Sequence, residues 1–136
     1  MVENVSPRQA WEALQSDPHA QLVDVRTDAE WTYVGLPDLS TGGKQPVLVS
    51  WQLFPTMQVD HAFVEHLRAS GLTPEQPLYF ICRTGARSLT AAQAAAQGGF
   101  ARTYNIAGGF EGPMDASKHR GHIAGWKADG LPWRQG

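Results

Sequence analysis

Short apolar runs alternate with amphipathic segments along most of the chain. Four runs rich in β-branched and aromatic residues predict buried strands: QLVDVR (21–26), PVLVSW (46–51), PLYFIC (77–82) and ARTYNI (101–106). Helical segments are expected between them, and this alternation indicates an α/β domain with a mostly parallel sheet. In such sheets, ligands bind at the carboxyl ends of the strands.

The predicted helices begin at capping residues and end at glycines. Ser6 can act as an N-cap, Pro7 takes the first helical position, and Gln9 completes a capping box. Thr27 and Glu30 repeat this spacing and predict a second, short helix. The remaining predictions are a helix over 61–70 that ends before Gly71, a helix from Arg87 to the glycine pair at 98–99, an exposed loop over 35–46, and one or two helical turns within 115–133, closed by Gly130 and Pro132.

Length and composition narrow the class of protein. The chain has 136 residues, 42% of them hydrophobic, which suits one domain over residues 1–136 with a buried core. The net charge of −2 predicts neither a nucleic-acid partner nor attraction to an anionic membrane. No secretory leader is visible, nor an apolar run of the roughly 18 residues that a membrane span requires, so we expect a cytoplasmic protein.

The single cysteine, Cys82, lies at the carboxyl end of the predicted strand 77–82 and cannot form an internal disulfide. The segment that follows it, RTGARS, supplies loop amides, the N-terminus of a predicted helix, and the positive charges of Arg83 and Arg87. All of these features stabilise a thiolate over a thiol. An unreactive buried cysteine is the alternative. Because arginines beside a buried strand end are costly without an anion to meet them, the loop favours a reactive cysteine that attracts anionic substrates.

Three motifs in order resemble the rhodanese family of sulfurtransferases over nearly the whole chain. They are LVDVRTDAEW, CRTGARS, and YNIAGGFEG with GWKADGLPW further on. The resemblance implies a five-stranded, mostly parallel sheet flanked by helices on both faces, with its fifth strand near VENV (2–5). It also implies that Cys82 takes the outer sulfur of a donor such as thiosulfate as a persulfide and passes it to a thiophilic acceptor: cyanide, a thiol or a protein thiol.

The resemblance assigns roles to particular residues and implies no cofactor. Arg83 would contact the anionic donor, and Gly85 would take a backbone shape that a side chain forbids. Arg87 would either face the substrate or turn inward to pair with Asp24 or Glu30, while Asp24 and Arg26 would form an ion pair that holds a strand end. The persulfide would be surrounded by the amides of Arg83, Thr84, Gly85, Ala86, Arg87 and Ser88.

Two segments depart from the family pattern. Many members have a Gly-His-Ile-type segment after the Glu-aromatic pair, whereas this chain reads YVGLPDLSTGGK, which predicts that one wall of the pocket differs where it would bear on the choice of donor. About a dozen residues, PMDASKHRGHIA, also separate GGFEG from GWKADG, and we expect this insertion near the mouth of the active site.

Other functions were weighed against sulfur transfer. A cysteine phosphatase or arsenate reductase needs five residues between its cysteine and arginine, but four separate Cys82 from Arg87. A non-catalytic binding module typically lacks the cysteine or the loop charges, both of which are present here. A persulfide carrier that serves one protein acceptor is intermediate between the enzyme and the binding module. His119 and His122 are three residues apart, but Cys82 has no cysteine or histidine at ligand spacing, so no metal site is expected.

Overall fold

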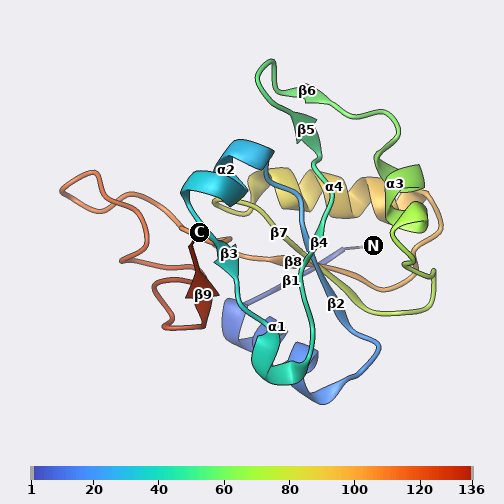
Figure 1. Ribbon diagram of the computed structural model, residues 1–136, viewed down its shortest axis with the longest axis horizontal. Coiled ribbons are helices and arrows are strands. Elements are labelled where there is room, and N and C mark those ends of the chain that lie inside the picture. Colours follow the sequence, from blue (N-terminus) through green and yellow to red (C-terminus); the bar gives the residue numbers. More distant parts are fainter. Residues whose placement is uncertain (1, 136) are drawn as a thin grey trace.

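The computed structural model describes residues 2–135 and consists of a central sheet with helices on both sides (Figure 1). Its helices and longer strands follow the predicted alternation. Their bounds are β1 Glu3–Val5, α1 Pro7–Ser16, β2 Gln21–Asp24, α2 Asp28–Tyr33, β3 Leu36–Pro37, the 3-10 turn η1 Ser40–Gly42, β4 Val47–Leu48, β5 Gln52–Leu53, β6 Gln58–Val59, α3 Phe63–Ala69, β7 Leu78–Ile81, α4 Ala86–Gln97, β8 Thr103–Ile106 and β9 Trp133–Arg134.

The central sheet has five parallel strands in the order β1-β8-β7-β2-β4. This confirms the predicted fold class, including the fifth strand that only the family resemblance supplied. In the middle of the sheet, Val23 of β2 lies opposite Phe80 of β7, and Phe80 lies opposite Asn105 of β8. The carboxyl ends of these three strands therefore meet at one edge, and Cys82 follows β7 at that edge.

Alternate residues of the strands face two separate cores. Leu78 and Phe80 pack with Phe63 and Leu67 of α3 and the buried alanines of α4, while Tyr79 and Ile81 lie on the face covered by α1. In Figure 1, α4 and α1 lie on opposite sides of the strands. The alanine-rich sequence of α4 suits this place, because Ala91, Ala92 and Ala95 are fully buried and their small side chains let the helix approach the sheet closely.

Both predicted capping boxes are present. At α1, the Ser6 hydroxyl accepts from the Gln9 amide and the Gln9 side chain accepts from the Ser6 amide. Thr27 and Glu30 make the same reciprocal contacts at the start of α2. Each box satisfies two backbone donors that the first turn of a helix otherwise leaves unpaired.

Three local predictions were wrong or incomplete. The strand expected over 46–51 pairs with the sheet only at Val47–Leu48, and the loop expected over 35–46 contains β3 and η1. No helix forms in the described chain over 115–133: of the helical turns expected there, a single hydrogen bond of α-helical spacing is present, from the Asp129 amide to the Gly125 carbonyl at 3.0 Å, and β9 after it pairs antiparallel with β3. The reason is backbone conformation, because Lys118, Gly121, Gly125 and Gly130 all have positive φ, which a right-handed helix excludes.

The second antiparallel pair, β5–β6, projects from the body of the molecule beyond α2 and α4 (Figure 1). Its apolar side chains are largely exposed, with Phe54 61% and Leu53 47% accessible to solvent. Within residues 2–135, no helix combines the length and the apolar character needed to cross a lipid bilayer.

Candidate active site

The sulfur of Cys82 lies inside the loop that links β7 to α4. It accepts a hydrogen bond from the Gly85 amide at 3.1 Å, and the Ser88 hydroxyl oxygen lies 3.2 Å from it. The N-terminus of α4 begins at Ala86, so the positive end of a 12-residue helix is directed toward the same loop. These donors and the helix end favour negative charge on the sulfur. Cys82 is only 1% exposed, so the loop encloses the thiol almost completely.

Gly85 has the backbone shape expected for it. Its φ of +105° lies in the left-handed region, where it forms the N-cap of α4 and turns its amide toward the sulfur. A Cβ atom built on it would lie 3.2 Å from the Gly108 amide nitrogen, in a position closed off by backbone. A larger residue here would therefore displace the donor that contacts Cys82.

Ser88 links the thiol to a residue that the sequence analysis did not select, Asn105 at the end of β8. The Ser88 hydroxyl lies 2.5 Å from Asn105 Oδ1, and Asn105 Nδ2 donates to the Gly85 carbonyl at 3.1 Å and to Asn4 Oδ1 at 2.9 Å. A serine hydroxyl carries one proton, so it donates to Asn105 or to the sulfur, not to both. A thiol can donate to Ser88 while Ser88 donates to Asn105, and a thiolate can take the Ser88 proton as a hydrogen bond.

Asn105 carried one usable signal in the sequence. It lies near the carboxyl end of the predicted strand ARTYNI, as Cys82 lies at the end of PLYFIC. The ends of adjacent parallel strands meet at one sheet edge, where a buried polar side chain needs a partner. The missing information was that β8 lies directly beside β7.

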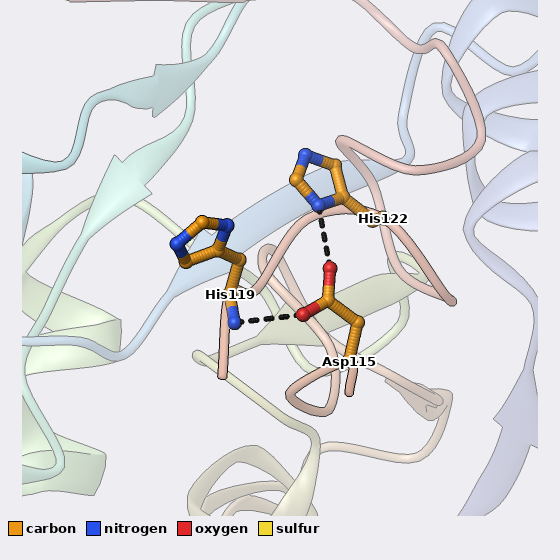
Figure 2. Close-up of side chains that lie close together, drawn as sticks. All are labelled: Asp115, His119 and His122. Atoms are coloured by element: carbon orange, nitrogen blue, oxygen red, sulfur yellow. Dashed lines mark hydrogen bonds and ion pairs between the residues drawn. The ribbon is translucent and has the colours of Figure 1, made fainter. Parts of the chain in front are cut away.

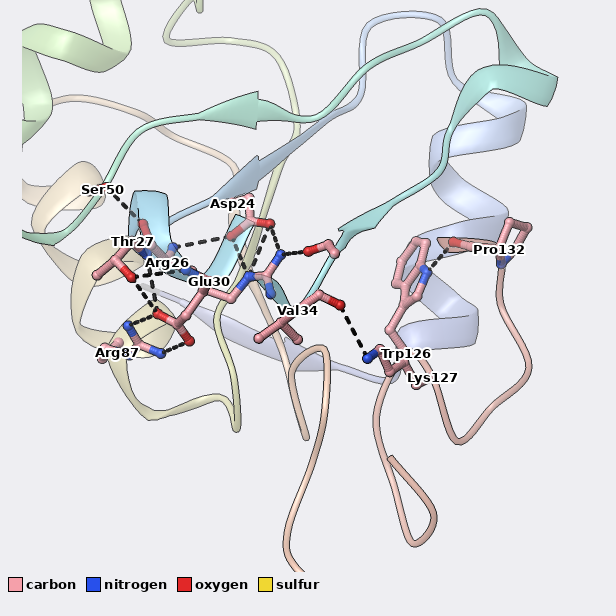
Figure 3. Close-up of polar contacts among 11 residues, drawn as sticks. Asp24, Arg26, Thr27, Glu30, Val34, Ser50, Arg87, Trp126, Lys127 and Pro132 are labelled. Carbon is pink, nitrogen blue, oxygen red and sulfur yellow. Dashed lines mark hydrogen bonds and ion pairs between the residues drawn. The ribbon is translucent and has the colours of Figure 1, made fainter. Parts of the chain in front are cut away.

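Arg87 turns inward and pairs with Glu30. Its two terminal nitrogens each donate to one carboxylate oxygen of Glu30 at 2.9 Å, a bidentate contact that joins α4 to α2 (Figure 3). Burial alone would raise the pKa of Glu30, but the hydrogen bonds and charge of Arg87 outweigh it and hold that pKa below its ordinary value of 4.5. The same contact raises the pKa of Arg87. Of the alternatives left open by the sequence, the structure therefore has the pair with Glu30.

Replacing Glu30 by glutamine is expected to lower the free energy of unfolding at pH 7 by about 1.5–3 kcal/mol, the range for hydrogen bonds to charged groups. Because the pKa of Glu30 is lowered in the folded protein, its stabilisation is present above the ordinary value of 4.5 and is lost as the pH falls through the folded-state pKa. Urea unfolding at pH 7, 5.5 and 4 measures this. Glu12→Gln, on the exposed side of α1, is the matched control, and a difference from wild type that stays constant down to pH 4 contradicts the assignment.

Asp24 and Arg26 form the fully buried ion pair expected at the end of β2. Arg26 Nη2 lies 2.7 Å from Asp24 Oδ2 (Figure 3) and donates to the Gly35 carbonyl at 2.7 Å, and its guanidinium lies over the ring of Phe110 at 4.4 Å. The Arg26 carbonyl accepts from the Ser50 hydroxyl at 2.7 Å. All of these contacts lie inside the protein, and neither side chain of the pair is exposed to solvent.

The loop is also held by two further layers of main chain. The Cys82 carbonyl accepts from the Phe110 amide at 2.8 Å, and the Arg83 carbonyl accepts from the amides of Glu111 and Gly112. The 109–112 segment is bonded in turn to the tail, since the Trp126 amide donates to the Gly109 carbonyl at 2.8 Å. A Cβ on Gly109 would lie 2.4 Å from the Cys82 carbonyl oxygen, so the layers approach too closely for a side chain.

A hollow of about 580 Å³ lies over the loop. Cys82 is buried and does not line it, but the residues that follow Cys82 do, and Arg83, an exposed residue, contributes a positive charge to it. Its other walls come from α2, from the β5–β6 hairpin and from Glu111, which precedes the insertion. The lining residues are Thr27, Ala29, Glu30, Val34, Gln52, Phe54, Met57, Arg83, Thr84, Ala86, Arg87 and Glu111. The segment YVGLPDLSTGGK, which was expected to change one wall of the pocket, contributes Val34 to the hollow. Phe54 and Met57 of the β5–β6 hairpin lie in the same lining.

The comparisons with known proteins agree with this geometry. A family model described as the STR4 middle domain matches residues 2–136. The crystal structure of Rv0390 from M. tuberculosis is 46% identical, aligns with 99% of this chain and 98% of that one, and has a TM-score of 0.90. The polysulfide-sulfur transferase homodimer of Wolinella succinogenes is 29% identical, with 99% of this chain and 80% of that chain covered and a TM-score of 0.69.

A plant relative carries the family name. Rhodanese-like domain-containing protein 4 of the Arabidopsis thaliana chloroplast is 30% identical over 129 residues, which are 94% of this chain and 25% of the plant protein. The family model covers almost the whole chain, residues 2–136. The resemblance noted in the sequence is therefore confirmed: this chain belongs to the rhodanese-like family.

Proposed function

We propose that this protein is a sulfurtransferase that moves a sulfane sulfur from thiosulfate or a similar anionic donor to a thiophilic acceptor. One observation carries the proposal: the only thiol of the chain lies in a cationic loop where the Gly85 amide donates to its sulfur at 3.1 Å and the Ser88 hydroxyl, 3.2 Å away, can donate to it once it is a thiolate. Those donors stabilise the thiolate needed for attack.

The reaction has two steps. The Cys82 thiolate attacks the outer sulfur of thiosulfate, the S–S bond of the donor breaks, and sulfite leaves with the bonding electron pair. The new persulfide places its outer sulfur toward the hollow, and an acceptor attacks that sulfur. With cyanide the products are thiocyanate and the regenerated thiolate, while a thiol acceptor leaves as its own persulfide. No electron is gained from or lost to a further reagent, so the cycle needs no redox cofactor.

Arg83 is the side chain proposed to hold the donor. It is exposed, it lines the hollow above the loop, and Arg87 is occupied by Glu30. A guanidinium binds the oxygens of a sulfonate-like group as it binds a carboxylate or phosphate. Asp24, Arg26 and Glu30 support the loop from behind, and the residues that follow Cys82 surround the persulfide.

A partner-dependent persulfide carrier is the second candidate, and the β5–β6 hairpin favours it. Phe54 and Met57 line the hollow and are 61% and 38% exposed, which is more apolar surface than a small inorganic donor requires. An acceptor that carries its thiol on a protein surface would meet this hairpin on its way to the sulfur. The two candidates share the persulfide and differ in the acceptor.

The test is the intact mass of the protein after brief incubation with thiosulfate. The expected result is a gain of one sulfur atom that cyanide removes and that prior alkylation of Cys82 prevents. Arg83→Gln is expected to raise the thiosulfate KM about tenfold, the scale of one charged hydrogen bond, while Arg102→Gln, an exposed arginine before β8 at the other end of the sheet, leaves it unchanged. If the mass does not increase with thiosulfate, mercaptopyruvate or polysulfide, the proposal of a sulfurtransferase is overturned. If a persulfide forms but releases its sulfur only slowly to cyanide and small thiols, the protein is a partner-dependent carrier.

A further inference from the structure

The insertion over 113–124 brings together three potential metal ligands that no part of the sulfur chemistry uses. They are Asp115, His119 and His122, and one side-chain ligand atom from each lies within 4.8 Å of the other two (Figure 2). The sequence analysis expected no metal here because it considered the two histidines without the aspartate. We infer that this cluster is a binding site for a divalent transition-metal ion of the Zn²⁺ type, separate from Cys82.

The separation of the ligand atoms is close to that of a bound set. His122 Nδ1 lies 2.9 Å from Asp115 Oδ2. Two ligand atoms that bind one ion at about 2.0–2.2 Å are separated by roughly 3.0–3.5 Å for angles between 90° and tetrahedral. An ion between these two atoms therefore replaces their hydrogen bond with little movement. The ligand atom of His119 lies within 4.8 Å of the other two, so a rotation of its side chain that brings it closer by at most about 1.8 Å completes the set.

The backbone already holds the carboxylate in place. Asp115 Oδ1 accepts from the amides of Ser117 and His119, each at 2.9 Å, so Oδ2 is the oxygen left for an ion. The Asp115 amide in turn donates to the His119 carbonyl at 2.7 Å, and Lys118 between them has a left-handed φ of +63°. This closed turn sets the relative positions of the first two ligands before any ion arrives, which lowers the entropy cost of binding.

The donor set selects the class of ion. Two imidazoles and one carboxylate suit Zn²⁺, Ni²⁺, Cu²⁺ or Fe²⁺, whereas Mg²⁺ and Ca²⁺ prefer oxygen ligands alone. His122 is 64% exposed and His119 is also exposed, so an ion reaches the cluster from solvent and keeps water in its remaining positions. Three protein ligands with an open fourth position is a common arrangement for Zn²⁺.

The chain offers a matched comparison site. His66 Nδ1 and Asp60 Oδ2 also lie 2.9 Å apart, and His66 is 55% exposed. Among the described residues, no third histidine, cysteine, aspartate or glutamate completes that pair. If a His–Asp contact alone were enough to bind an ion, both the Asp115–His122 pair and the Asp60–His66 pair would bind it. If the third ligand is needed, only the site with His119 will bind.

The cluster is joined to the active-site loop through main chain. The Gly121 amide donates to the Glu111 carbonyl, the Arg120 guanidinium donates to the Gly112 carbonyl at 2.9 Å, and the amides of Glu111 and Gly112 donate to the Arg83 carbonyl. An ion that ties Asp115 to His122 therefore fixes the segment on which these contacts depend. Hydrogen exchange over 113–124 is expected to slow when the ion binds.

The experiment is a calorimetric titration of the tag-free full chain with Zn²⁺, carried out in the Cys82→Ser background so that the active-site thiol cannot bind the ion. One equivalent is expected to bind, and His119→Ala and His122→Ala are each expected to weaken binding by about tenfold or more. Asp115→Asn keeps the oxygen that closes the turn and is expected to weaken binding as well. His66→Ala is expected to leave the affinity unchanged.

Two further measurements make the outcome decisive. Melting temperatures without metal, compared with the parent chain, show that each variant is folded, and hydrogen exchange locates the bound ion independently of the heat signal. The inference is overturned if Zn²⁺ does not bind below about 1 mM, if His66→Ala weakens binding as much as His122→Ala, or if exchange over 113–124 does not change. None of these results depends on sulfur transfer, so the metal site and the proposed function are tested independently.

Discussion

Serine in place of Cys82 is expected to abolish sulfur uptake from thiosulfate and to lower the rate of thiocyanate formation by a factor of about 10⁴ or more. The hydroxyl does not ionise near neutral pH, and its oxygen cannot take over a sulfane sulfur to form a persulfide. The folded structure should be retained, because the smaller side chain still meets the Gly85 amide and the Ser88 hydroxyl. Intact mass and thiocyanate assays measure the loss, and the melting temperature checks the fold.

Ser88→Ala is the graded companion of that variant. It keeps the nucleophile but removes the hydroxyl that can donate to the thiolate, and the loss of a hydrogen bond to a charged group corresponds to a fall in rate of about 10- to 100-fold. The order wild type, Ser88→Ala, Cys82→Ser is therefore expected. Turnover that survives in Cys82→Ser would mean that the transfer does not proceed through this residue.

Replacing Arg26 by methionine is expected to lower the free energy of unfolding by about 3–5 kcal/mol, the usual cost of removing one partner from a buried ion pair. The Asp24 carboxylate would stay buried with no countercharge, and the Gly35 carbonyl would lose its donor. For a chain of this size the melting temperature should fall by roughly 10–20 °C. Urea unfolding and thermal melts at pH 7 measure both quantities.

Arg68→Met provides the control for that substitution. Arg68 also donates to a backbone carbonyl, that of Gly98, and also lies over a phenylalanine ring, but it is exposed and has no buried carboxylate beside it. Its replacement should cost less than about 1 kcal/mol. The double variant Asp24→Leu/Arg26→Met should recover part of the loss, because an apolar pair leaves no buried charge. Equal effects of the two single arginine substitutions would show that burial of the ion pair is not the cause.

The elements that could be predicted from the sequence are those whose signals are local. The buried strands β2, β7 and β8 appear as short apolar runs, and the boundaries of α1 and α2 appear as capping boxes whose two members are three residues apart. Cys82 could be selected because a lone thiol, a strand end, a glycine and two arginines follow one another directly. Each of these predictions depends only on neighbouring residues in the sequence and needs no knowledge of tertiary contacts.

The features that could not be predicted depend on contacts distant in sequence. β1 is a three-residue edge strand whose place is fixed by pairing with β8, about 100 residues away, and its composition shows no alternation. Asn105 became a candidate only when β8 was seen beside β7. Asp115 lies beside the two histidines because the backbone between them turns through a left-handed residue, a conformation found in neither a helix nor a strand. The same kind of backbone explains why the tail was wrongly predicted as helical.

The two layers of main chain behind the Cys82 loop have a consequence for mutagenesis. Most of what supports this loop is carbonyl to amide contact between 82–83, 109–112 and 124–127, and such contacts survive when a side chain is cut back to alanine. Alanine at the exposed positions of the tail would therefore record little effect, whereas Trp126 and Leu131, which are buried, would report the loss of core packing and not the main-chain contacts. Adding atoms is more informative than removing them. A methyl group on Gly109 or Gly112 would collide with a backbone oxygen and push the layers apart. Such a variant would inactivate the thiol by a steric clash, although no side-chain interaction has been removed.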